Sequence, residues 1–144
     1  MCSIFFSTEK YDIKDLDDIN YYNKFRGPDD TTTLNFETNA YPEVPNMSGD
    51  YSEKKGYISI IHNLLTITGN FTQQPFVKDQ IVCLYNGEVY NYKSFGDFKS
   101  DGECLIYLYE TYGDNFTTKI DGEFAIVLLD ADKDKLIISS DIFK

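Results

Sequence analysis

The chain has 144 residues, of which 42% are apolar and 16% aromatic, enough for one domain with a packed core and too few for two ordinary domains. Its formal net charge is −11, and its 13 basic residues are scattered rather than gathered in a run. We therefore expect neither nucleic acid nor an anionic membrane as a partner. With no apolar stretch near the roughly 20 residues of a membrane span, and no signal-peptide pattern, we expect a cytoplasmic protein.

Three cysteines, Cys2, Cys83 and Cys104, are odd in number, widely spaced and in no CxxC arrangement. This pattern predicts neither a disulfide framework nor a zinc site, so at least one thiol is free. Cys83 lies in an apolar strand pattern and Cys104 on an apolar helix face, where cysteine usually packs as a small hydrophobe. We expect no metal and no cofactor.

The first third of the chain predicts a strand, a helix and a turn. Residues 2–6 form a short apolar run, and residues 11–25 carry apolar side chains at near-helical spacing. The helix should end at Arg26-Gly27-Pro28, because glycine and proline both terminate helices. The polar stretch 39–56, rich in proline and glycine, predicts a long loop. The expected buried face of the helix consists of Ile13, Leu16, Ile19 and either Tyr22 or Asn23.

The rest of the chain predicts strands around one helix. Residues 57–68 and 80–92 are rich in β-branched and aromatic residues, with Asn86-Gly87 interrupting the second run. Ser100 and Glu103 fit a capping box, from which a helix should run to Tyr112. Residues 124–130 and 136–143 flank a polar turn and predict a β-hairpin. Strand pairs in sequence favour antiparallel pairing, so we predict the α+β class.

Cys2 becomes the first residue if Met1 is removed, and it then carries a thiol and a free α-amine together. The amine has an ordinary pKa of about 7.7 to 8.0 and is placed to accept the proton of the thiol, directly or through one water. A nucleophile and its base would thus share one residue. Taken alone, a cysteine at position 2 is more often just the start of a buried strand.

Six motifs occur in an order that resembles the glutaminase domain of asparagine synthetase. They are Met1-Cys2-Ser3-Ile4, Arg26-Gly27-Pro28-Asp29, His62 to Thr68 followed by Gln74-Pro75, Asn86-Gly87-Glu88-Val89-Tyr90-Asn91, Ser100-Asp101-Gly102-Glu103 and Asp121-Gly122-Glu123-Phe124-Ala125. The resemblance covers nearly the whole chain. It implies a class II, N-terminal-nucleophile glutamine amidotransferase with a four-layer αββα sandwich.

The resemblance also implies roles for particular residues. Cys2 would attack the side-chain amide of glutamine, form a γ-glutamyl thioester and release ammonia, after which water frees glutamate. The side-chain amide of Asn86 and the backbone N–H of Gly87 would form the oxyanion hole. Glu88 and Asp101 would bind the α-ammonium group of glutamine.

Blander roles stand beside these. An Asn-Gly pair within an apolar strand is otherwise a bulge or a hairpin turn, and Asp101 is otherwise a helix cap. Arg26, the only arginine, lies in the turn that shapes the wall beside the nucleophile in the family, where structural support is favoured over ligand contact. His62, the only histidine, falls at a structural strand position of the family.

The chain departs from the family at the arginine that clamps the α-carboxylate of glutamine, because Leu64 occupies that position. An unpaired carboxylate in a closed site costs binding energy unless another cation replaces the arginine. Ser3, Ser140 and Lys144 are further departures. The candidate replacements are Arg26, Lys54, Lys55 and Lys78.

These observations leave three hypotheses. In the first, residues 1–144 form an amidotransferase domain without the last strands of the family or its ATP-dependent synthetase domain, so that the ammonia acceptor lies on another chain. An unpaired last strand would then favour a partner chain or self-association. In the second, the chain is an impaired amidotransferase-like module that binds an amino acid or is vestigial. In the third, the motifs are accidental, and the candidate site residues would not converge in space.

Overall fold

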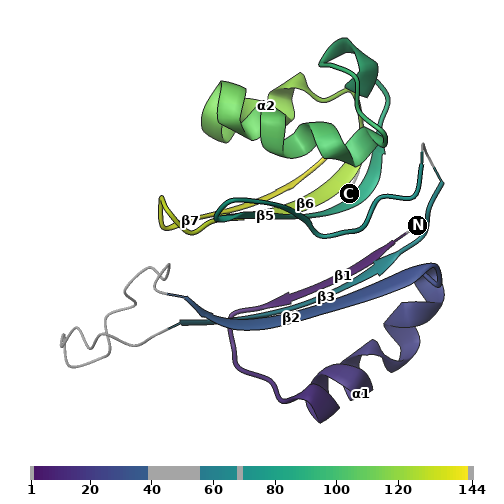
Figure 1. Ribbon diagram of the computed structural model, residues 1–144, viewed down its shortest axis with the longest axis vertical. Helices are drawn as coiled ribbons and strands as arrows, with labels where there is room; N and C mark the ends of the chain where they lie inside the picture. Colours follow the sequence, from purple (N-terminus) through teal and green to yellow (C-terminus); the bar gives the residue numbers. More distant parts are fainter. Residues whose placement is uncertain (1, 39–55, 68–69, 143–144) are drawn as a thin grey trace.

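The computed structural model describes residues 2–38, 56–67 and 70–142. In these residues two antiparallel sheets face each other, and a helix lies on the outer side of each sheet (Figure 1). Helix α2 covers the sheet β4-β5-β6-β7, and helix α1 covers the sheet β1-β3-β2 (Figure 1). The predicted α+β class with antiparallel sheets is confirmed.

The first sheet has β3 (Gly56–Leu64) at its centre, paired antiparallel with β1 (Ser3–Ser7) and β2 (Asp30–Thr38). The strands predicted at residues 2–6 and 57–68 are therefore confirmed, although β3 ends four residues early. Strand β2 was not predicted, because three consecutive threonines and an asparagine obscure its alternation. Partly buried Leu34 and Phe36 nevertheless alternate with exposed neighbours along it.

The second sheet consists of β4 (Phe76–Lys78), β5 (Ile81–Val89), β6 (Gly122–Asp130) and β7 (Lys135–Ser140). The predicted interruption of the second strand is wrong, because Asn86 and Gly87 pair in unbroken register with Ala125 and Phe124. Gly87 is instead required by close packing. A Cβ there would overlap the carbonyl oxygen of Glu123 and lie 2.7 Å from the Cα of Phe124.

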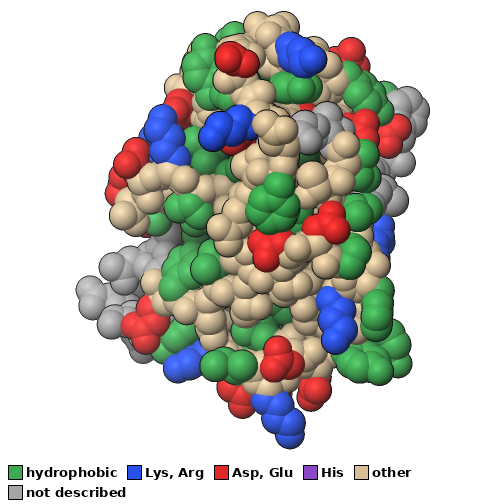
Figure 2. Space-filling model, turned by 45° about the vertical axis from the view of Figure 1, so that its right-hand side comes forward, with side chains coloured by type: hydrophobic (Ala, Val, Ile, Leu, Met, Phe, Trp, Pro, Cys, Tyr) green, Lys and Arg blue, Asp and Glu red, His purple; other side chains and the backbone are tan. Residues whose placement is uncertain are grey.

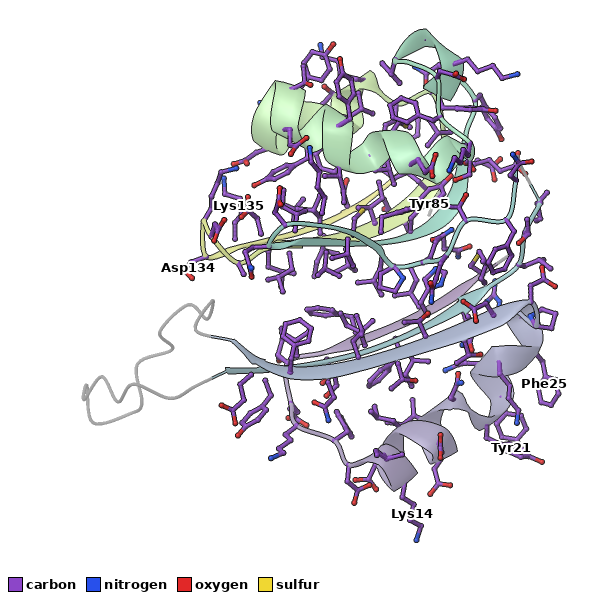
Figure 3. All side chains as sticks on the ribbon, viewed as in Figure 1. Lys14, Tyr21, Phe25, Tyr85, Asp134 and Lys135 are labelled. Atoms are coloured by element: carbon purple, nitrogen blue, oxygen red, sulfur yellow. The ribbon has the colours of Figure 1, made fainter. Side chains whose placement is uncertain are left out.

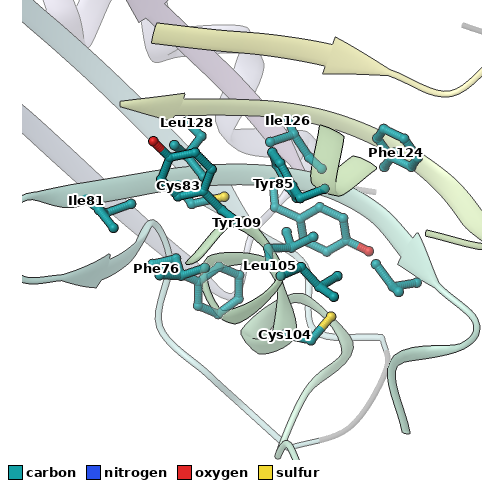
Figure 4. Close-up of a cluster of buried hydrophobic side chains, with 14 residues drawn as sticks. Phe76, Ile81, Cys83, Tyr85, Cys104, Leu105, Tyr109, Phe124, Ile126 and Leu128 are labelled. Atoms are coloured by element: carbon teal, nitrogen blue, oxygen red, sulfur yellow. The ribbon is translucent and has the colours of Figure 1, made fainter. Parts of the chain in front are cut away.

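Two apolar clusters hold the layers together. The first lies between the sheets, where Ile58 and Ile60 of β3 meet Leu84 of β5 and Leu129 of β6. Side chains from both sheets fill this space (Figure 3). The second cluster lies between α2 and the second sheet (Figure 4), and it includes Cys83 and Cys104, both fully buried. The expectation that these cysteines pack as small hydrophobes is confirmed.

Helix α1 (Ile13–Asn23) begins at Asp12, whose side chain accepts a hydrogen bond from the N–H of Asp15, and continues into the 3-10 turn η1 (Lys24–Arg26). The predicted helix is confirmed, but its buried face is only partly right. Leu16 is buried, whereas Ile13 and Tyr22 are each 78% exposed. The face turned towards the sheet is completed by polar contacts, in which Asn20 exchanges hydrogen bonds with Asn63 of β3. Apolar spacing alone does not reveal such a face.

Helix α2 (Cys104–Tyr112) follows the 3-10 turn η3 (Asp101–Glu103), and the turns η2 (Tyr92–Ser94) and η4 (Gly113–Lys119) flank this region. The predicted capping box does not form, because the Ser100 side chain makes no capping hydrogen bond. Glu103 instead accepts from the N–H of Lys99, at 2.7 Å. The helix ends as predicted, at Gly113 with a φ of 63°.

Strands β6 and β7 form the predicted hairpin, with Asp130 opposite Lys135. Strand β7 is an edge strand of its sheet within the described residues. The predicted strand 136–143 is too long, because β7 ends at Ser140 and neither Asp141 nor Ile142 is in a strand, while Phe143 lies outside the described residues. The predicted loop 39–56 lies outside the described residues except for Gly56, the first residue of β3. In the described part of the chain no helix has the length and apolarity that crossing a membrane requires.

Candidate functional site

A pocket of about 250 Å³ draws its lining from both sheets and from the loops that follow them. Cys2 lies immediately before β1, Leu64 ends β3, and Asn86 to Glu88 belong to β5. Asp101 enters from the turn that precedes α2. Segments far apart in the sequence therefore meet in one cavity. Five of the six candidate site residues line it, namely Cys2, Asn86, Gly87, Glu88 and Asp101.

The side chain of Cys2 is only 8% exposed and is fixed by the backbone of Leu65. The N–H of Leu65 donates to Sγ at 3.3 Å, and the thiol donates to the carbonyl oxygen of Leu65 at 3.7 Å. Cysteine acts as a nucleophile through its sulfur atom, which these two contacts fix in position. The thiol of Cys2 is thus fixed in position in the wall of the pocket.

The pocket wall around Leu65 is positioned by the turn that contains Arg26. Asp29 accepts a hydrogen bond from the N–H of Thr66 at 2.7 Å, and its own N–H donates to the carbonyl of Leu64 at 3.0 Å. A Cβ at Gly27 would overlap the carbonyl of Asn63. Arg26 itself is exposed and is not among the pocket-lining residues. The turn supports the site through Asp29 and Gly27 rather than through the arginine.

Asp101 is buried in the pocket lining and is hydrogen-bonded to strand β5 of the second sheet. Its Oδ2 accepts from the hydroxyl of Tyr85 at 2.5 Å and from the N–H of Val89 at 2.9 Å. Burial raises the pKa of Tyr85 well above its ordinary value, and the neighbouring carboxylate raises it further, so Tyr85 remains a donor. Since both bonds go to Oδ2, Oδ1 accepts no hydrogen bond from the described residues.

Two further carboxylates line the pocket, from Glu88 on β5 and Glu123 on β6. Partial desolvation raises the pKa of the neighbouring Tyr90, and the charges of Glu123 and Glu88 raise it further. With Asp101, the lining carries three acidic side chains and, among the described residues, no lysine or arginine. The potential inside is therefore negative.

Four polar side chains in the lining have a buried atom without a hydrogen-bond partner in the described structure. These atoms are Thr66 Oγ1, Gln74 Oε1, Asn86 Oδ1 and Ser100 Oγ. Buried polar atoms are normally paired, because an unpaired one loses its hydration without compensation. Their gathering in one cavity indicates a site for a polar ligand. All four residues stand within the motifs quoted above, but only Asn86 was predicted to belong to the site, and Ser100 was predicted only to cap a helix.

Leu64, which stands where the resemblance led us to expect a carboxylate-binding arginine, is 4% exposed and contributes apolar surface to the pocket. The proposed substitutes for that arginine are not found among the described residues of the pocket lining. Lys78 pairs with Glu110 on α2 at 2.7 Å and does not line the pocket, whereas Lys54 and Lys55 lie outside the described residues. On the face shown in Figure 2, lysine and arginine side chains are scattered among acidic ones rather than gathered in a patch.

His62 lies in β3 and is completely buried away from the pocket lining. Its Nε2–H donates to the carbonyl oxygen of Tyr85 at 3.0 Å, so that it ties the two sheets together. Burial lowers its pKa, against the opposing effects of this hydrogen bond and the charge of Asp30. The histidine is therefore a neutral, structural residue, as its strand position indicated.

A family model described as a glutamine amidotransferase domain matches residues 1–143. The chain therefore belongs to the glutamine amidotransferase family, and the resemblance drawn from its motifs is confirmed. Its relatives include glutamine-hydrolyzing asparagine synthetases. The probable enzyme of Schizosaccharomyces pombe is 36% identical over 94 residues, which are 57% of this chain and 17% of the relative.

The putative asparagine synthetase 1 of Methanocaldococcus jannaschii is 30% identical over 134 residues, or 83% of this chain and 24% of the relative. The Gibberella zeae protein named Amidase chry2 is 34% identical over 113 residues, which are 67% of this chain and 16% of the relative. The chain thus matches only about a sixth to a quarter of the length of these relatives.

Proposed function

We propose that this chain is a glutaminase domain in which Cys2 hydrolyses glutamine to glutamate and ammonia. The observation that carries the proposal is the convergence of Cys2, Asn86, Gly87, Glu88 and Asp101 on one pocket. These five residues come from three separate segments of the chain. Accidental motifs would not be expected to meet in this way.

The reaction follows from the chemistry of the lining. The Cys2 sulfur attacks the γ-carboxamide carbon, and its proton passes through the α-amine of Cys2 to the departing nitrogen, which leaves as ammonia. Water then adds to the thioester carbon, the carbon–sulfur bond breaks, and glutamate leaves with the thiol restored. The Asn86 side-chain amide and the Gly87 N–H are assigned to the oxyanion, where losing one donor typically costs about 10²- to 10³-fold in rate.

Glu88 and Asp101 are assigned to the α-ammonium group of glutamine. The unoccupied Oδ1 of Asp101 and the negative pocket both support this role. Arg26 is assigned a supporting role only, in the turn behind Leu65. The layer order in Figure 1 supports the N-terminal-nucleophile sandwich as the fold.

The destination of the ammonia is a second part of the proposal. The relatives' names pair asparagine synthesis with glutamine hydrolysis, so we assign the ammonia to an acceptor domain, for which a separate chain is the candidate. Such a chain, or a second copy, would cover the edge of β7, where Ile138 is 69% exposed.

A second candidate function is a binding module that retains the pocket without hydrolysis. The observation that favours it is Leu64, which leaves the α-carboxylate of glutamine without a cationic partner among the described residues. A module of this kind would bind ligand without forming a covalent intermediate.

Covalent labelling separates the two candidates. The mass of the purified protein is measured by mass spectrometry before and after incubation with a glutamine-derived diazo-ketone, with Cys2→Ser as the matched control. Cys83 and Cys104 are fully buried and should stay unlabelled in the folded protein. Loss of Met1 with one adduct at Cys2, and ammonia release abolished in Cys2→Ser, supports the glutaminase. Retained Met1 or an unlabelled Cys2 favours the binding module.

A further inference from the structure

The charges in the pocket bear on which form of glutamine it accepts. Three carboxylates line it, from Glu88, Asp101 and Glu123, and no basic side chain of the described residues offsets them. Within those residues, no group of three or more acidic, histidine or cysteine side chains is arranged to hold a metal ion. An organic ammonium group is therefore the cation that this lining fits.

Uncharged polar groups provide the second observation. Gln74 and Ser100 are 8% and 6% exposed, line the pocket, and each has a buried oxygen without a partner in the described structure. The Gln74 oxygen accepts a hydrogen bond from an ammonium, and the Ser100 hydroxyl donates to a carbonyl. Neither carries a positive charge, so neither neutralises a carboxylate.

A free glutamine carries an α-ammonium and an α-carboxylate side by side. With the ammonium assigned to Glu88 and Asp101 as proposed above, the carboxylate would meet Leu64 and a lining that carries no basic side chain among the described residues. Burying an anion without a counter-charge is costly, and like charges nearby add to the cost. A neutral α-carbonyl avoids both penalties while keeping the ammonium and the γ-carboxamide.

We infer that the pocket selects glutamine whose α-carboxyl group is held in an amide bond, with its α-ammonium free, over free glutamine. This inference rests on the glutaminase function proposed above and names its substrate class. The sulfur of Cys2 attacks the γ-carboxamide as before, ammonia leaves, and water yields the corresponding γ-carboxylate with the α-amide intact. Leu64 is the specificity-determining residue.

The test compares three substrates by the mass of the γ-carboxylate product, which excludes ammonia lost by spontaneous cyclisation. They are free glutamine, glutamine N-methylamide, and the peptide Gln-Ala-Ala N-methylamide. Chain lacking Met1 should use the N-methylamide about tenfold or more better than glutamine in kcat/KM, as expected when an unpaired buried charge is removed. Activity on the peptide indicates that the substrate is the N-terminal glutamine of a peptide. Activity on the small amide alone indicates that the substrate is a small molecule.

Two variants sharpen the test. Leu64→Arg should reverse the preference, while the near-isosteric, uncharged Leu64→Met should keep it. If the chain lacking Met1, with Leu64 unchanged, has a kcat/KM for free glutamine equal to or higher than that for the amides, the inference is overturned and the glutaminase function still stands. The same ligands are titrated against Cys2→Ala by calorimetry. Tighter binding of the amides to Cys2→Ala, together with no hydrolysis of any of the three substrates by the chain that retains Cys2, supports the selectivity and overturns the glutaminase. No binding of any ligand overturns both.

Discussion

His62 should make the stability of the domain depend on pH in a range where few other groups titrate. It is completely buried, it donates through Nε2 to the carbonyl of Tyr85, and burial lowers its pKa. The unfolded chain therefore binds a proton near the ordinary histidine pKa of about 6.5, before the folded chain does. Because protonation favours the unfolded state, this contribution to stability is present above that pH and is lost on acidification towards the folded-state pKa.

The size of the effect follows from proton linkage. One proton taken up only on unfolding lowers the unfolding free energy by up to about 1.4 kcal/mol per pH unit. Between pH 7.5 and 5.5 we expect a loss of up to about 1.4 kcal/mol, because the ordinary pKa lies in the middle of this interval. His62 is the only histidine in the chain, so the interval isolates it from other side chains.

Urea unfolding at closely spaced pH values measures this loss, with His62→Gln as the control. Glutamine retains an N–H donor for the Tyr85 carbonyl but does not titrate, so the difference between the two proteins removes the contribution of the carboxylates. The ring C–H resonances of His62, followed by NMR, should titrate in the folded protein with a midpoint below the ordinary histidine pKa of about 6.5. An equal pH dependence in both proteins, or a histidine that titrates near 6.5, would refute the reasoning.

Two further predictions concern stability alone. Gly87→Ala places a methyl group against the backbone of Glu123, which cannot move without disturbing β6, so urea unfolding should show a loss of about 1–3 kcal/mol. Leu105→Ala empties a fully buried position between α2 and its sheet and should cost about 2–5 kcal/mol in the same assay. The control Lys78→Ala breaks an exposed pair with Glu110 and should cost less than about 1 kcal/mol; an equal loss in both would contradict the assigned core.

The sequence predicts most of the elements, and its errors have physical causes. The hairpin of β6 and β7 and the helix that ends at Gly113 carry strong local signals and are confirmed. Strand β2 was missed because its threonines and asparagine read as loop, although sheet pairing with β3 satisfies them. The face of α1 was misjudged because asparagines, not apolar residues, complete its contact with the sheet.

The candidate site was predictable only in part. The order of the motifs identified five residues that the fold brings to one pocket. The strand register that places Gly87 opposite Phe124 could not be predicted from the local sequence pattern. The contribution of Glu123 depends on the pairing of β6 with β5, which places it opposite Glu88. The positions of Thr66 and Ser100 in the pocket depend on loop geometry, which a periodic sequence pattern does not predict.

The dependence of the site on the fold explains why its chemistry and its stability cannot be separated. Cys2 is fixed by the Leu65 backbone at the end of the first sheet, while Asp101 is fixed by Tyr85 in the second. The hydrogen bond from His62 to the Tyr85 carbonyl joins these two sheets beside the pocket. Cys2 and Asp101 therefore keep their separation only while the sheets stay in contact. A change that weakens this contact should loosen the pocket before it unfolds the domain.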